Sequence, residues 1–146
     1  MVTGENKSLN SAININKVFV YGTLMKGFSN YKIFLEGKIE RITPATINGL
    51  LYHLPEGYPA LLEGNEIIKG EVVEPVDEEL LKALDWLEDY VEGGSDNLYD
   101  RVIKKVMTED GKEKLCWVYI FKDSRYAKEK GTHVAHGDWR RFMEGK

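Results

Sequence analysis

The chain lacks the features that mark secreted, membrane-bound and nucleic-acid-binding proteins. Its 146 residues include a single cysteine, Cys116, so no internal disulfide can form and the cytoplasm is the default location. No apolar run approaches the roughly 20 residues that cross a bilayer, and residues 1–16 do not resemble a signal peptide. The net charge of −4, without a long run of one sign, argues against nucleic acid or an anionic membrane as a partner.

The chain also lacks the patterns that hold cofactors and metal ions. It has no Gly-x-Gly-x-x-Gly or P-loop motif, so nucleotide binding has no support. His133 and His136 have i, i+3 spacing, but no third ligand accompanies them. Cys116 lies in an apolar stretch without an adjacent basic residue, which favours a buried thiol over a reactive one. We therefore expect neither a metal ion nor a cofactor.

What is present is enough for one domain built mainly of short strands. The first 16 residues are polar and rich in Asn, Ser and Gly, so we expect a disordered tail at 1–16 and a single domain at 17–146. Apolar, β-favouring runs between Gly and Pro predict strands at 18–21, 45–54, 60–62, 67–76, 99–108 and 114–121. With one main helix, the pattern favours an α+β fold with a strongly curled sheet or a small barrel.

The helix predicted over residues 80–90 carries an unusual carboxylate. Asp77 is a good N-cap for it, and its leucines share one arc when successive residues are placed about 100° apart. Glu88 falls inside this arc, where burial would raise the pKa of its carboxyl and make it a useful proton carrier. A structural role is the alternative, in which Glu88 pairs with a buried arginine such as Arg101 or caps a loop.

A second candidate feature is the turn that ends the first predicted strand, Tyr21-Gly22-Thr23-Leu24. Glycine permits a tight backbone whose amides point at a ligand, and Thr23 adds a hydroxyl. Such a turn can hold a carboxylate or an oxyanion. A strand followed by a glycine turn is common, so the turn alone indicates little.

The two features occur within a longer set of motifs. Val18-Phe19-Val20-Tyr21-Gly22-Thr23-Leu24 opens the series, and Leu84-Asp85-Trp86-Leu87-Glu88 lies on the predicted helix. The remaining motifs, in order, are Gly49-Leu50-Leu51-Tyr52, Gly57-Tyr58-Pro59-Ala60, Ile68-Lys69-Gly70-Glu71-Val72, Tyr99-Asp100-Arg101, Trp117-Val118-Tyr119 and Gly137-Asp138-Trp139. In this order the chain resembles the γ-glutamylcyclotransferase-like (AIG2-like) family from Lys17 to Phe142.

The resemblance implies a small, curled, mixed β-barrel with flanking helices and a cavity beside the Tyr21–Leu24 turn. It implies an enzyme, of acyltransferase or lyase type, that converts a γ-glutamyl amide to 5-oxoproline and a free amine without a cofactor. The family's catalytic glutamate aligns with Glu88, which would act as general base and acid. The substrate would bind at Tyr21, Gly22, Thr23 and Leu24, with Tyr119 as a further candidate.

Several alternatives stay open at this point. The hydroxyls of Tyr21 and Tyr119 could orient a glutamyl group, although strand tyrosines are as often core residues. For Arg101 a structural ion pair is the simpler interpretation, and for Asp85 a role as acceptor at the helix edge. The scaffold could also bind a small molecule without turnover, or serve only as an interaction module. The leaving amine and the oligomeric state do not follow from the sequence.

Overall fold

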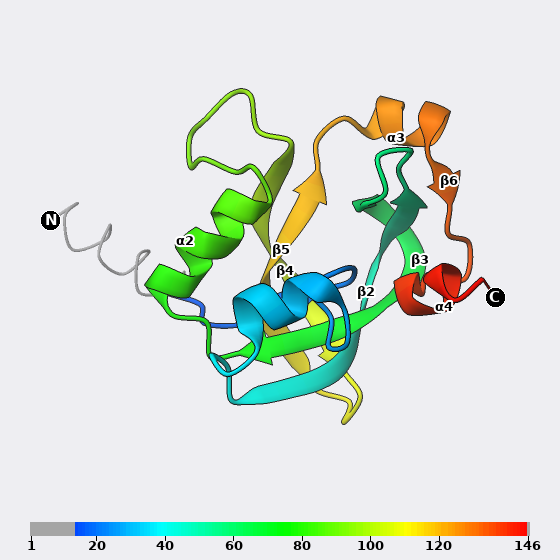
Figure 1. Cartoon of the computed structure of the whole chain (residues 1–146). Coiled ribbons are helices and arrows are strands. Elements are labelled where there is room, and N and C mark those ends of the chain that lie inside the picture. The colour runs from blue at the N-terminus through cyan, green and yellow to red at the C-terminus, as the bar shows by residue number, and fades with distance from the viewer. Residues whose placement is uncertain (1–13, 146) are drawn as a thin grey trace, which may run out of the picture.

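A computed structural model describes residues 14–145. Its centre is a closed mixed barrel of five strands (Figure 1). These are β1 (Val18–Val20), β2 (Arg41–His53), β3 (Pro59–Glu74), β4 (Tyr99–Thr108) and β5 (Glu113–Phe121). Around the barrel the order is β1, β5, β4, β2 and β3, and β3 pairs with β1 to close it. Only the β1–β5 pair is parallel. The α+β class and the small mixed barrel predicted from the sequence are confirmed.

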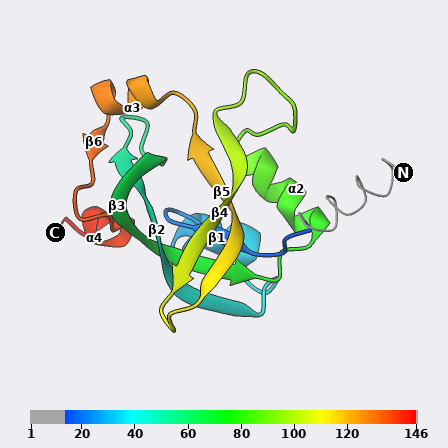
Figure 2. The same cartoon turned by 180° about the vertical axis from the view of Figure 1, so that it is seen from behind.

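The helices lie on opposite sides of this barrel. On one side are the short π-helix η1 (Tyr31–Leu35) and α2 (Glu78–Leu87), which contact each other. On the other are α3 (Ser124–Lys130), the short strand β6 (Thr132–His133), which pairs with β2, and α4 (Trp139–Met143). The view from behind shows the same separation (Figure 2). None of the helices between residues 14 and 145 is long and apolar enough to cross a membrane.

The short strand β1 organises the buried centre. Its three residues are at most 3% exposed, so both faces of the strand are covered. Such continuous burial is typical of a strand held between two neighbours in the middle of a fold. The chain leaves β1 at Tyr21 and turns at once, which places the Tyr21–Leu24 turn at the edge of the core.

Several predicted boundaries differ from the structure. The two strands expected at 60–62 and 67–76 are one strand, β3, because a bulge opposite Gly49 and Leu50 accommodates the intervening residues. The helix starts at Glu78, as the predicted cap at Asp77 implies, but it ends at Leu87 rather than at residue 90, because Asp89 has φ +56° and reverses the chain. Asp77 is its N-cap as predicted, accepting a hydrogen bond from the Leu80 amide at 2.7 Å.

The segment assigned to the tail is described only from residue 14. The rest of it lies outside the described residues. The carbonyl of Ile15 accepts a hydrogen bond from the Trp117 indole at 3.1 Å, and that of Asn16 accepts one from the Val76 amide at 2.7 Å. Residue 15 therefore contacts strand β5 of the barrel, and residue 16 contacts the segment between β3 and α2.

Candidate active site

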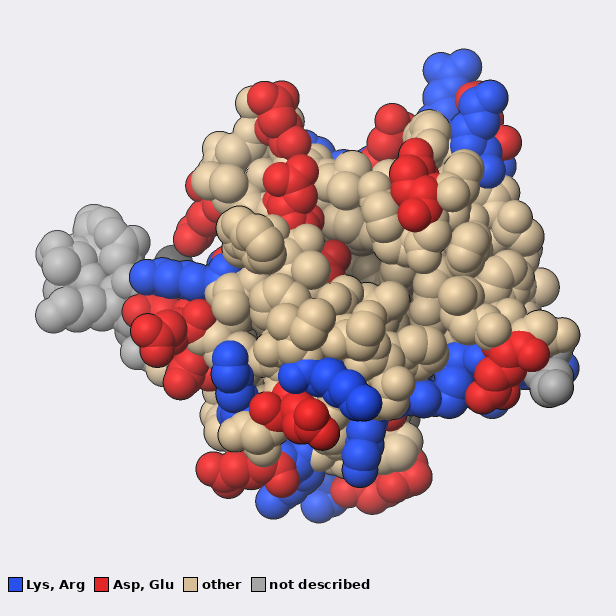
Figure 3. Space-filling view, viewed as in Figure 1, with Lys and Arg blue, Asp and Glu red and all other residues tan. Residues whose placement is uncertain are grey.

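A cavity of about 240 Å³ opens where β1 ends, between the barrel and the end of α2. The space-filling view of the face seen in Figure 1 is hollowed near its centre, and uncharged residues form most of the surface around the hollow (Figure 3). The residues that line the cavity are Phe19, Val20, Tyr21, Gly22, Thr23, Leu24, Asn30, Tyr58, Pro59, Leu87, Glu88, Leu98, Tyr99 and Tyr119. All the residues that the sequence singled out for catalysis and substrate binding are among them.

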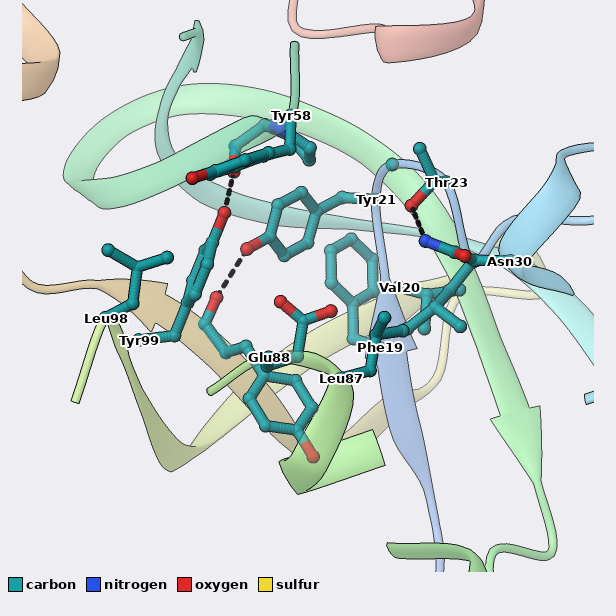
Figure 4. Close-up of a pocket in the computed structure, with 14 residues that line it drawn as sticks. Phe19, Val20, Tyr21, Thr23, Asn30, Tyr58, Leu87, Glu88, Leu98 and Tyr99 are labelled. Atoms are coloured by element: carbon teal, nitrogen blue, oxygen red, sulfur yellow. Dashed lines mark hydrogen bonds between the residues drawn. The ribbon is translucent and has the colours of Figure 1, made fainter. Parts of the chain in front are cut away.

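Among the described residues, Glu88 is the only charged one in this lining. It follows the last helical residue of α2, and its carboxyl group points into the cavity toward Tyr21 and Phe19 (Figure 4). Among the described residues no group donates a hydrogen bond to this carboxyl or pairs with it. Burial raises its pKa from the ordinary 4.5 to about 7, because the protein removes water from the charged form without offering a compensating cation.

Arg101 does not neutralise Glu88, which was the structural alternative. Its Nε atom lies 3.0 Å from Oδ1 of Asp85 in an ion pair that is largely buried. Asp85 also accepts a hydrogen bond from the Tyr119 hydroxyl at 2.7 Å. The two carboxyl groups at this end of the helix thus differ: between residues 14 and 145, Asp85 has two partners and Glu88 has none.

The turn after β1 leaves its backbone amides free. Within residues 14–145 the amides of Gly22, Thr23 and Leu24 donate to no acceptor, while the carbonyls of Gly22 and Thr23 accept from Met25 and Tyr31 at 3.0 and 3.1 Å. These two hydrogen bonds to the carbonyls connect the turn to the residues that follow it in the chain. Three adjacent unpaired amides at a cavity can bind an anion or a developing oxyanion.

Gly22 is required here by close packing rather than by an unusual φ. A Cβ atom at this position would lie 2.4 Å from Cγ of Pro59, which packs directly against the turn. Thr23 is fixed as well, because its hydroxyl accepts a hydrogen bond from the Asn30 side chain at 2.7 Å. The turn is therefore held in place by packing and by hydrogen bonds.

Three of the four tyrosines that line the cavity donate their hydroxyl protons to other groups of the protein. Tyr21 donates to the carbonyl of Tyr119 at 2.6 Å, and Tyr99 donates to the carbonyl of Pro59 at 2.5 Å (Figure 4). The hydroxyl of Tyr119 is donated to Asp85. Both hydroxyl protons are thus donated within the protein, so Tyr21 and Tyr119 could orient a glutamyl group only as hydrogen-bond acceptors, and that role stays a prediction. Burial raises the pKa of all three phenols, so they stay protonated near neutral pH.

Sequence reasoning missed several lining residues, of which Asn30, Tyr58 and Tyr99 carry polar groups. Tyr58 and Tyr99 belong to two of the motifs noted in the sequence, Gly57-Tyr58-Pro59-Ala60 and Tyr99-Asp100-Arg101. Their place in those motifs was the available signal. Asn30 gave no such signal, since its position depends on how η1 folds back on the Tyr21–Leu24 turn.

The two histidines of the C-terminal segment do not form a metal centre with other side chains of the described chain. Nε2 of His133 lies 2.8 Å from a carboxylate oxygen of Glu66. Nδ1 of His136 accepts a hydrogen bond from the Asp138 amide at 3.3 Å. Between residues 14 and 145 no three His, Cys, Asp or Glu side chains are gathered as metal ligands.

Comparison with known proteins agrees with this architecture. Residues 18–141 match the family described as γ-glutamyl cyclotransferase, AIG2-like. The chain therefore belongs to the γ-glutamyl cyclotransferase, AIG2-like family. A γ-L-glutamyl-butirosin B γ-glutamyl cyclotransferase of Niallia circulans is 36% identical over 137 residues, which cover 93% of this chain and 83% of the relative.

Solved structures support the same fold. An AIG2-like protein of Mus musculus superposes with a TM-score of 0.66 and 28% identity, over 86% of this chain and 88% of the mouse chain. A protein of Arabidopsis thaliana has a TM-score of 0.65 and 22% identity over 92% and 86% of the two chains, a likeness of fold alone. The family and its named relatives support an enzyme of the γ-glutamyl cyclotransferase type.

Proposed function

We propose that this protein converts a γ-glutamyl amide into 5-oxoproline and a free amine, with Glu88 as the general base and acid. The observation that carries the proposal is the unpaired carboxyl of Glu88, which points into a cavity that is also lined by free backbone amides. A pKa of about 7 lets this carboxyl both accept and deliver a proton near neutral pH. The cavity of about 240 Å³ suits an amino-acid-sized group rather than a large ligand.

The reaction is an intramolecular aminolysis. Ionised Glu88 takes a proton from the α-ammonium group of the substrate, and the freed amine nitrogen attacks the γ-carbonyl carbon. A five-membered ring closes, the carbonyl oxygen becomes an oxyanion, and the ring nitrogen releases its remaining excess proton to solvent; the free amine takes up an equivalent proton after it leaves. The oxyanion collapses as the bond to the leaving nitrogen breaks, and protonated Glu88 delivers its proton to that nitrogen. Because nucleophile and electrophile belong to one molecule, holding the ring-closing conformer supplies much of the acceleration.

The turn on the opposite wall would supply the remaining stabilisation. The amides of Gly22, Thr23 and Leu24 would donate to the oxyanion or to the α-carboxylate of the glutamyl group. A well-placed donor to an oxyanion is worth about 3–4 kcal/mol of transition-state stabilisation. No Lys, Arg or His of the described residues lines the cavity, so among its lining groups these amides are suited to bind a carboxylate.

The substitution Glu88→Gln tests the proposal. It keeps shape and volume but cannot carry a proton, and positioned proton transfer is worth about 10²–10⁴ in rate. We expect 5-oxoproline formation from a panel of γ-glutamyl amides, measured by mass spectrometry, to fall by at least about 100-fold while binding persists. Asp89→Asn is the matched control, because Asp89 is exposed and Asn tolerates its positive φ. It should leave turnover unchanged.

Two outcomes would contradict the proposal. Turnover by Glu88→Gln close to that of the parent would refute the role of Glu88. A parent protein that binds γ-glutamyl amides in a calorimetric titration but forms no 5-oxoproline would instead be a binding protein on the same scaffold.

A further inference from the structure

We propose that Asp85 and its two partners, Arg101 and Tyr119, are positioning residues that hold Glu88 over the cavity. This inference rests on the proposed function of Glu88 and extends it to residues outside the reacting group. Asp85 and Arg101 do not line the cavity, and the Tyr119 hydroxyl is donated to Asp85. Any effect of Asp85 or Arg101 on turnover would therefore act through another residue.

The first step is that no polar group of the described residues fixes the Glu88 carboxyl. Its carboxyl has no hydrogen-bond or ion-pair partner among the described residues, so its place depends on the backbone that carries it. That backbone is where α2 stops: the Glu88 amide bonds to the Leu84 carbonyl at 2.9 Å, and Asp89 turns the chain away with φ +56°. Helix ends fray unless they are tied down.

The second step is that Asp85 ties this end down on both sides of Glu88. Three residues before Glu88, its carboxylate binds Arg101 of β4 and Tyr119 of β5. Its backbone carbonyl accepts the amide of Tyr90, two residues after Glu88, at 2.9 Å. Arg101 also contacts the segment after Glu88 through cation–π interactions. Its guanidinium lies 5.2 Å from the centre of the Tyr90 ring and 4.2 Å from that of the Trp117 ring.

The third step connects this network to the other wall of the cavity. The backbone carbonyl of Tyr119 accepts the hydrogen bond of Tyr21, the residue that precedes the free amides of Gly22, Thr23 and Leu24. One tyrosine thus contacts both the helix that carries the acid and base and the strand that leads into the Tyr21–Leu24 turn. Displacement of a reacting group by about 1 Å is enough to cost about 100-fold in rate.

Turnover by Asp85→Asn is the first test. The substitution removes the charge that pairs with Arg101, and we expect kcat to fall about 10- to 100-fold with KM within about threefold of the parent. Combined with Glu88→Gln, the same substitution should lower the residual rate by less than about threefold, because the group being positioned is already gone. Glu79→Gln, an exposed carboxylate on the same helix, is the matched control and should leave both constants unchanged.

The second test does not depend on catalysis. Tyr119→Phe removes one hydroxyl without changing the charge or the backbone carbonyl, so it releases Asp85 from β5 alone. We expect a carboxyl-resolved NMR titration to show the Glu88 pKa falling from about 7 toward its ordinary value, as the loosened helix end admits water. The titratable groups that couple to Glu88 are the phenols of Tyr21, Tyr99 and Tyr119, and all are neutral in this range.

The outcomes separate this inference from the proposed function. An equal loss of kcat in the parent and in Glu88→Gln would mean that Asp85 is merely structural, and an unchanged Glu88 pKa in Tyr119→Phe would overturn the positioning role. If the parent forms no 5-oxoproline, the proposed function fails while the titration still decides whether Glu88 is held by this network. If Asp85→Asn does not fold, the Tyr119→Phe titration decides the inference.

Discussion

Two carboxyl groups, three residues apart at the end of one helix, have opposite environments. Asp85 has an ion pair with Arg101 and a hydrogen bond from Tyr119, and its side chain is 17% exposed. Glu88 has no partner among the described residues and points into a cavity. Burial raises the pKa of both, but for Asp85 the Tyr119 hydrogen bond and the Arg101 charge oppose the effect. The Asp85 carboxylate connects α2 to strands β4 and β5, whereas the Glu88 carboxyl can exchange a proton with a molecule in the cavity.

The largest expected effect is that neutralising Asp85 lowers the free energy of unfolding, whereas neutralising Glu88 does not. Asp85→Asn leaves the Arg101 guanidinium, on a side chain only 9% exposed, without its counter-ion. We expect a loss of about 2–3 kcal/mol in the free energy of unfolding, somewhat below the cost for a fully buried pair. Glu88→Gln at pH 8 removes a charge that has no partner among the described residues, so stability should stay equal or rise by up to about 2 kcal/mol.

Urea unfolding of both variants and the parent measures this contrast, with Glu79→Gln as the control for loss of an exposed carboxylate. Equal destabilisation by Asp85→Asn and Glu88→Gln would mean that Glu88 has a structural partner after all. The distinction between the two groups would then disappear.

A smaller effect follows from the raised pKa of Glu88. In the folded state its pKa is about 7, and in the unfolded chain it is about 4.5, so the unfolded state releases its proton first as the pH rises. Glu88 therefore destabilises the fold increasingly between about pH 4.5 and 7, and the penalty is complete above that range. The full shift corresponds to about 3 kcal/mol, and partial exposure reduces our expectation to about 1–2 kcal/mol.

The measurement is the difference in unfolding free energy between the parent and Glu88→Gln at several pH values. Other titrating groups cancel in this difference, which should move in favour of the variant from pH 4.5 to 7. A flat difference across this range would show that the Glu88 carboxyl is as well solvated in the folded protein as in the unfolded one.

The sequence was informative about Glu88 because the clue was local. A carboxylate among leucines at helical spacing stands out, even though the predicted helix was too long: Glu88 follows its last residue instead of lying within it. The hairpin between β4 and β5 was equally local, since Asp110-Gly111 is a turn signal and Gly111 has φ +82°. Strand β4 has the predicted bounds for the same reason.

Contacts between residues far apart in the sequence could not be predicted from local patterns. Asp85, Arg101 and Tyr119 meet only because β4 and β5 pair and α2 packs near them, and no local pattern encodes that contact. The helices α3 and α4 were missed because each is short, at seven and five residues. Segments of this length are marginal without tertiary contacts, and Trp139 supplies such contacts by stacking on His53 at 5.2 Å between ring centres.

The smallest expected effect concerns the wall of the cavity opposite the two carboxyl groups. A Cβ atom on Gly22 would meet Cγ of Pro59 at 2.4 Å, so Gly22→Ala must push the turn and Pro59 apart. We expect a cost of about 1 kcal/mol, at the low end for overpacking, because Pro59 is the first residue of β3 and can shift. Pro59→Ala removes the clashing atom, so the double variant should be more stable than the sum of the single effects by about 1 kcal/mol. Urea unfolding of the four proteins measures this coupling. Strictly additive effects would show that the turn moves to accommodate the added methyl group. Its backbone amides would then not be held rigidly opposite the Glu88 carboxyl.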